Sequence, residues 1–182
     1  VVAELTLELL KPAKNEKATL EDQINDTVKA ANKDNTAVKW TSGTKPTILS
    51  ELPDGDYKLS ETVVPDRYQV TDSIQFTIEN GVVKNTTGSK IVMIDKLSEV
   101  TVSKKAINGT EELPGAVLTI ELKEAAEEGA SLKDIKVGGG AVSPASSADK
   151  IVFTSGETAA VISGLPDGKY TLTETTSPDG YT

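Results

Sequence analysis

An internal repeat constrains the fold of this chain more than any other feature. The stretch SELPDGDYKLSETVVPDRYQ, residues 50–69, recurs as SGLPDGKYTLTETTSPDGYT, residues 163–182, with an offset of 113 residues and identity at 12 of 20 positions. The same offset, without a gap, places AELTLELL at Ala3–Leu10 on AVLTIELK at Ala116–Lys123. Repetition at a fixed offset is typical of tandem homologous modules. We therefore predict two modules, residues 1–97 and 98–182, joined by little linker.

Apolar residues in both modules alternate with polar ones, which predicts half-buried antiparallel strands. The pattern is clear at Leu5, Leu7 and Leu9, and again at Ile74, Phe76 and Ile78. Each LPDG element has the residues of a tight turn and leads directly into such a strand. Asn80-Gly81 between two apolar segments predicts a two-residue hairpin. The expected fold class is all-β, with two tandem Greek-key, immunoglobulin-like sandwiches.

One segment of the first module departs from the strand pattern. In Thr19–Asp34, the apolar residues Leu20, Ile24, Val28 and Ala31 recur at helical spacing, and Thr19 has the side chain of an N-terminal cap. We predict a short helix inserted there. The second module has the Gly-rich KVGGGAVSPASSADK at this position, so the two modules fill one variable connection differently.

Composition excludes several classes of function. The 28 acidic and 19 basic residues give a net charge of −9, which disfavours nucleic acid and anionic membrane surfaces as partners. Cysteine and histidine are absent, and with them disulfides, thiolate or imidazole metal ligands, and catalysis by Cys or His. We expect no metal site and no cofactor. No signal peptide precedes the first strand, so we also expect an internal fragment of a longer protein.

Four ionisable residues have the strand parity of apolar neighbours. Tyr57 and Leu59 predict an inward Glu61, and the repeat predicts the same for Glu174. Val100 and Val102 share a face with Lys104, as Ile91 and Met93 do with Asp95. Such groups are costly to bury as isolated charges.

Three interpretations of these residues stay open at this point. Each residue could lie at a strand end that has reached solvent, or lysine and carboxylate could form a buried salt bridge. The third interpretation is chemical: burial lowers the pKa of lysine and raises that of a carboxyl group, so a neutral amine can meet a protonated acid. With a second carboxyl group to transfer protons, the amine can form an amide and expel water.

The combination of motifs resembles a known family. SKKAINGTEELPGAVLTIE, residues 103–121, followed by LPDGKYTLTETTSPDGY, residues 165–181, is similar to the Cna B-like, or prealbumin-like, repeats of Gram-positive collagen adhesins and pilins. The stretch KIVMIDK, residues 90–96, is similar to the reactive peptide of engineered tag-and-catcher pairs derived from such domains.

The resemblance implies an intramolecular isopeptide bond between a first-strand Lys and a last-strand Asp or Asn, with a catalytic Glu on a central strand. Lys104 matches the nucleophile, Asp95 the acceptor, and Glu61 and Glu174 the catalytic acid. By the repeat, however, residues 1–97 lack the first strand and residues 98–182 lack the last. Lys104 cannot take Asp95 of its own chain in family geometry, because parallel neighbours need a crossover of about a dozen residues and only Lys96–Glu99 connect them.

The function that this implies is a structural stalk or backbone fragment of a cell-wall-anchored, extracellular adhesin or pilus. Its partners would be neighbouring modules of the same protein. Alternatives are a module that binds a host ligand, although only 4% of residues are aromatic, and a split self-ligating domain that accepts a donor strand or another chain. The bond forms once per molecule, so we do not expect a turnover enzyme.

Overall fold

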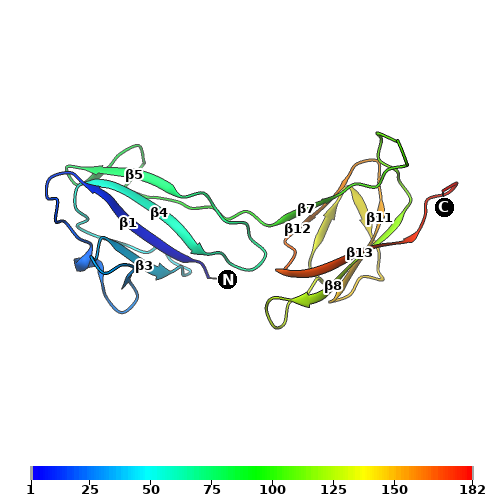
Figure 1. The fold of residues 1–182 in the computed structure, drawn as a ribbon, viewed down its shortest axis with the longest axis horizontal. Coiled ribbons are helices and arrows are strands. Elements are labelled where there is room, and N and C mark those ends of the chain that lie inside the picture. The colour runs from blue at the N-terminus through cyan, green and yellow to red at the C-terminus, as the bar shows by residue number, and fades with distance from the viewer. Residues whose placement is uncertain (1, 182) are drawn as a thin grey trace. The chain divides into compact units, whose positions relative to one another are not determined.

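The computed structural model describes residues 2–181, and these form two units whose regular secondary structure is β-strand apart from one 3-10 turn (Figure 1). The first unit contains the chain up to Pro65 together with Gln69–Lys96, and the second contains Asp66–Tyr68 together with the chain from Leu97 onward. Asp66–Tyr68 lies in the loop that follows β4, yet it belongs to the second unit. There Arg67 Nη2 donates to the Ser131 carbonyl at 2.7 Å.

The first unit contains one antiparallel sheet of six strands in the order β2-β3-β1-β4-β5-β6. Its elements are β1 (Glu4–Pro12), the 3-10 turn η1 (Glu21–Gln23), β2 (Lys29–Ala30), β3 (Ala37–Thr41), β4 (Gly55–Val63), β5 (Ile74–Glu79) and β6 (Val82–Val83). The sheet buries Leu7, Trp40, Tyr57 and Leu59 on one face. Ile91 and Met93, from an extended segment that belongs to no strand, pack against this core.

The second unit is a sandwich of two antiparallel sheets, ordered β10-β11-β8-β13 and β7-β12-β9. Its strands are β7 (Glu99–Val102), β8 (Val117–Ala125), β9 (Lys136–Gly138), β10 (Gly140–Val142), β11 (Lys150–Ser155), β12 (Ala160–Ser163) and β13 (Gly168–Thr176). Ile120, Phe153 and Ile162 lie in the core between the sheets. The all-β fold class expected from the sequence is therefore confirmed.

The repeat offset is preserved in the strand register. Leu5 pairs with Trp40 in the first unit, and Leu118 pairs with Phe153 in the second, which is the same pair displaced by 113 residues. Both large side chains are buried. Four strands of the first unit, β2-β3-β1-β4, therefore follow the same order as β10-β11-β8-β13 in the second.

The inserted helix is present only as the single 3-10 turn η1, shorter than the predicted Thr19–Asp34. Leu20, without a side-chain hydrogen bond, is its N-cap in place of Thr19. Asn25 ends the turn, because its side-chain oxygen accepts the N–H groups of Thr27 and Val28 at 2.9 and 3.0 Å. Such local hydrogen bonds compete with a helix. Leu20 and Val28 are nevertheless buried, so the apolar spacing came from core packing rather than from a helix.

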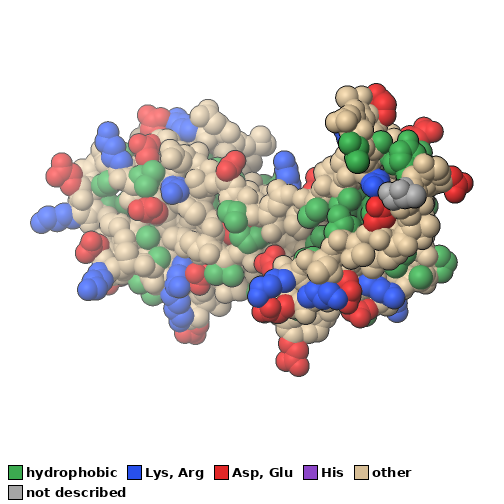
Figure 2. All heavy atoms as spheres, turned by 45° about the vertical axis from the view of Figure 1, so that its right-hand side comes forward, with side chains coloured by type: hydrophobic (Ala, Val, Ile, Leu, Met, Phe, Trp, Pro, Cys, Tyr) green, Lys and Arg blue, Asp and Glu red, His purple; other side chains and the backbone are tan. Residues whose placement is uncertain are grey.

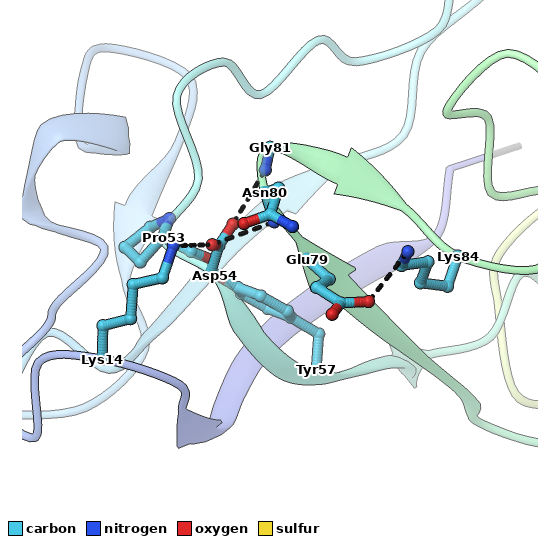
Figure 3. A network of polar contacts seen from close by, with 8 residues as sticks. All are labelled: Lys14, Pro53, Asp54, Tyr57, Glu79, Asn80, Gly81 and Lys84. Atoms are coloured by element: carbon cyan, nitrogen blue, oxygen red, sulfur yellow. Dashed lines mark hydrogen bonds and ion pairs between the residues drawn. The ribbon is translucent and has the colours of Figure 1, made fainter.

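The LPDG turn of the first unit is held by an ionic network (Figure 3). Asp54 accepts the backbone N–H groups of Asn80 and Gly81 at 3.0 and 2.9 Å and pairs with Lys14 Nζ at 2.8 Å. These contacts, the Lys14 hydrogen bond foremost, lower the pKa of Asp54 to about 2. Asn80 and Gly81 both have positive φ, as the predicted two-residue hairpin requires.

A tyrosine after each LPDG turn anchors that turn to the following strand. The Tyr57 hydroxyl donates to the Pro53 carbonyl at 2.6 Å, and the equivalent Tyr170 donates to Pro166 at the same distance. Burial, with a smaller effect from the charge of Asp54, raises the pKa of Tyr57 to about 12. The repeated motif thus has one structural role in both units.

Candidate functional site

Glu61 lies on the buried face of β4. The strand alternates through Tyr57, Leu59 and Glu61, whose exposed fractions are 0, 8 and 9%. The partner of Glu61 across the ladder is Leu5 on β1. A carboxyl group therefore occupies a position where the strand pattern places apolar side chains.

The environment of Glu61 raises its pKa above the ordinary value of a glutamate. Both carboxyl oxygens are buried, and neither has a well-formed hydrogen bond. Burial raises the pKa of Glu61, and the negative charge of Asp95 raises it further, while the Thr71 backbone N–H acts in the opposite direction. Within residues 2–181, Glu61 makes no ion pair with a lysine or arginine. A buried acid with these properties can hold and release a proton.

Asp95 approaches Glu61 from the extended segment Lys90–Lys96. The segment alternates between half-buried Ile91, Met93 and Asp95 and exposed residues between them, as a strand would, but it belongs to no ladder. Thr71 holds its end, with the hydroxyl oxygen 3.1 Å from the Ile94 carbonyl and 3.3 Å from Asp95 Oδ1. The first unit thus holds Asp95 near enough for its negative charge to raise the pKa of Glu61.

Lys104 and Glu174 form a pair in the second unit. Lys104 Nζ lies 3.1 Å from Glu174 Oε2, and the two side chains are 27% and 31% exposed. Lys104 follows β7 on the same face as Val102, and its backbone N–H donates to Glu112 at 3.0 Å. Glu174 pairs across the ladder with Leu118, the equivalent of Leu5, so Glu174 occupies the position of Glu61.

The two equivalent glutamates differ in exposure because different residues surround them. Leu59 is 8% exposed on β4, whereas the equivalent Leu172 on β13 is 53% exposed, and Glu174 is exposed beside it. Ile91 and Met93 cover the face of β4 in the first unit.

A groove in the first unit lies beside the segment that carries Asp95. Its volume is about 510 Å³, and it runs between Thr47–Leu49 and Lys90–Met93 over a floor that includes Leu5, Trp40 and Leu59. The equivalent of residues 47–50 in the second unit is β12, which pairs with β7. No strand of the described residues pairs with residues 47–50. The groove therefore lies where a counterpart of β7 would lie.

The structure thus places the four predicted residues as two pairs in separate units. Sequence reasoning missed Thr71, which contacts Asp95, because Thr71 lies in an irregular segment with no periodicity to indicate the direction of its side chain.

Charged side chains of both signs are interspersed on the face in Figure 2. Among residues 2–181, no cluster of three or more acidic side chains could hold a metal ion. In the same range, no helix is long and apolar enough to span a membrane.

The two-unit repeat, the tyrosine-anchored turns and the paired ionisable residues define a class of tandem all-β modules. One family, the SpaA prealbumin-like fold domain, matches the sequence twice, over residues 5–90 and 98–182. The chain belongs to this family, whose domains occur in the stalks of Gram-positive pili and adhesins. Neither a curated protein nor a solved structure matches the chain in the comparisons made.

Proposed function

We propose that this chain is part of the extracellular stalk of a Gram-positive pilus or adhesin, in which Lys-Asp isopeptide bonds lock the modules. One observation carries the proposal: each unit holds two of the three groups that the bond requires. The second unit holds an amine 3.1 Å from a glutamate, and the first holds the equivalent glutamate beside an aspartate. The ladders make Glu174 the equivalent of Glu61, so a lysine placed beside Glu61 as Lys104 is beside Glu174 would complete the site with Asp95.

The second unit gives the register that a strand docked in this groove would have. There Val102 pairs with Ala160 and Val100 with Ile162. Ala160 and Ile162 correspond to Thr47 and Leu49 by the repeat offset. A strand like β7 would therefore have the equivalent of Val102 opposite Thr47 and the equivalent of Val100 opposite Leu49. Of these two valines, Val102 packs against the core in the second unit and Val100 is 44% exposed. A strand docked in the same way would put the equivalent of Val102 in the groove and a lysine two residues further on, near Glu61.

The chemistry follows from these environments. A neutral lysine amine attacks Asp95 Cγ, and a C–N bond replaces a C–O bond. Protonated Glu61 gives its proton to one Asp95 oxygen, accepts a proton from the attacking nitrogen and passes it to the same oxygen, which leaves as water. Glu61 ends as a carboxylate, and one amide and one water replace the amine and the carboxylate. The bond forms once per molecule.

Such a bond has a clear role in a stalk. A chain without cysteine cannot form disulfides, and modules near 100 residues have modest cores. A covalent link between the first and last strands would keep a module closed under tension and against proteases. The partners of this protein would be neighbouring modules of the same chain.

A peptide added in trans tests the assignment. We expect VTVSKKA, copied from Val100–Ala106, to dock in the groove of the first unit and to couple, giving an adduct lighter than the sum of the two by one water. Replacing its first lysine by arginine should stop coupling, and the same change at its second lysine should not. Intact mass and peptide mapping measure both.

Changes in the protein complete the test. Asp95→Ala should abolish coupling, and Glu61→Gln should slow it by about 10²-fold or more while docking persists, because the proton carrier is lost and the shape is kept. Without peptide, the 182-residue chain should keep its full mass. A peptide that docks and never couples, or that couples equally well to Asp95→Ala, would contradict the assignment.

A further inference from the structure

Thr71 is the polar residue that contacts the backbone and the side chain around Asp95. It lies between β4 and β5, half-buried, with its hydroxyl oxygen 3.1 Å from the Ile94 carbonyl and 3.3 Å from Asp95 Oδ1. Its backbone N–H faces Glu61 and acts against the rise in the Glu61 pKa. Thr71 thus contacts Asp95, the proposed acceptor, and its backbone also influences Glu61, the proposed proton carrier.

The hydroxyl has one proton for two acceptors. A threonine hydroxyl donates a single hydrogen bond, and a backbone carbonyl can only accept. The shorter contact goes to the Ile94 carbonyl, and the distance to Asp95 Oδ1 is long for an O–H···O bond. Before the reaction, therefore, the proton is shared and Oδ1 receives only part of it.

Attack by an amine changes this balance. As the amine adds to Asp95 Cγ, the oxygen that does not leave takes on a full negative charge, which is a far stronger acceptor than the neutral Ile94 carbonyl. An interaction that strengthens as charge develops lowers the barrier, whereas one of constant strength does not. Donors placed at such an oxygen are worth about 10²- to 10³-fold in rate in water-excluded sites.

We propose that the Thr71 hydroxyl is the oxyanion donor of the isopeptide reaction, holding Asp95 Oδ1 while Oδ2 takes the Glu61 proton and leaves as water. This inference rests on the proposed function. This proposal gives the two Asp95 oxygens different roles, because Oδ1, which accepts the hydrogen bond from Thr71, becomes the carbonyl oxygen of the amide. In the proposed steps the proton of the attacking nitrogen passes through Glu61 to Oδ2, and Thr71 keeps its own.

The test measures docking and coupling separately with the VTVSKKA peptide. Thr71→Val is close in shape and should lower the coupling rate at saturating peptide by about tenfold or more, with peptide affinity unchanged. Thr71→Ser restores a hydroxyl and should recover most of the rate. If Thr71 had only a structural role, its substitution would change peptide affinity or folding instead of the coupling rate. Fluorescence of Trp40, the only tryptophan of the sequence, reports whether the first unit is folded.

Thr77→Val is the matched control. Thr77 also donates to an aspartate of the same unit, Asp56 Oδ1 at 2.7 Å. Because Asp56 takes no part in the proposed reaction, removal of the Thr77 hydroxyl should leave the coupling rate unchanged. Wild-type coupling rates in Thr71→Val, or equal losses in Thr71→Val and Thr71→Ser, would overturn the role of Thr71 while leaving the bond itself intact. A wild-type chain that docks the peptide without coupling would overturn the bond and the role of Thr71 together.

Discussion

At the scale of single residues, Asp54 makes stability depend on pH. Its contacts with Lys14 and the Asn80-Gly81 turn hold the folded pKa at about 2, below the ordinary 3.8. A depressed carboxyl pKa adds stability that is complete above about pH 4 and is lost as pH falls through about 2. We predict that Asp54→Asn lowers the Tm of the first unit at pH 7, and that its difference from wild type shrinks toward pH 2. Thermal scans at several pH values measure this, with exposed Asp34→Asn as the control. A difference that is constant with pH would show that the Asp54 charge is not responsible.

At the scale of elements, β4 and β13 are nearly the same strand with different coverage. Leu59 and Leu172 are equivalent, yet Ile91 and Met93 pack on the core that contains Leu59, and Leu172 is 53% exposed. We predict that Leu59→Ala costs about 2–5 kcal/mol of unfolding free energy, as buried leucines do, whereas Leu172→Ala costs about 0.5 kcal/mol or less. Urea unfolding, followed by Trp40 fluorescence for Leu59 and by NMR for Leu172, compares the two. Similar costs would mean that the strand itself, rather than the segment over it, stabilises this position.

At the scale of the whole molecule, the chain has two separate cores. The buried cluster around Trp40 and the one around Phe153 share no residue, and each lies in its own unit. Effects on distant sites without shared partners are expected to be independent. We predict that Phe153→Ala lowers the unfolding free energy of the second unit by about 3–5 kcal/mol. The unfolding transition of the first unit, followed by Trp40 fluorescence, should stay unchanged. Calorimetry together with fluorescence measures this, and a matching shift in both transitions would mean that the units unfold as one.

The sequence alone determined the all-β architecture. Period-two alternation and the LPDG turns are local patterns that follow directly from strand and turn geometry, and the gapless repeat shows that the pattern occurs twice. The offset of 113 residues predicted which residues are equivalent, and the ladders keep that register. Parity also predicted that Glu61 lies among apolar residues. The same local reasoning overestimated the helix, because Leu20 and Val28 share helical spacing only through core contacts, and the Asn25 side chain ends the turn.

Only the tertiary structure decided how each candidate residue is surrounded. Parity places Glu61 and Glu174 alike, but one is buried and the other exposed, because burial depends on segments far along the chain that a strand pattern does not encode. The same reason hid Thr71, whose contacts with Ile94 and Asp95 join segments more than twenty residues apart. Local periodicity determines the face on which a residue lies, and long-range packing determines what that face meets.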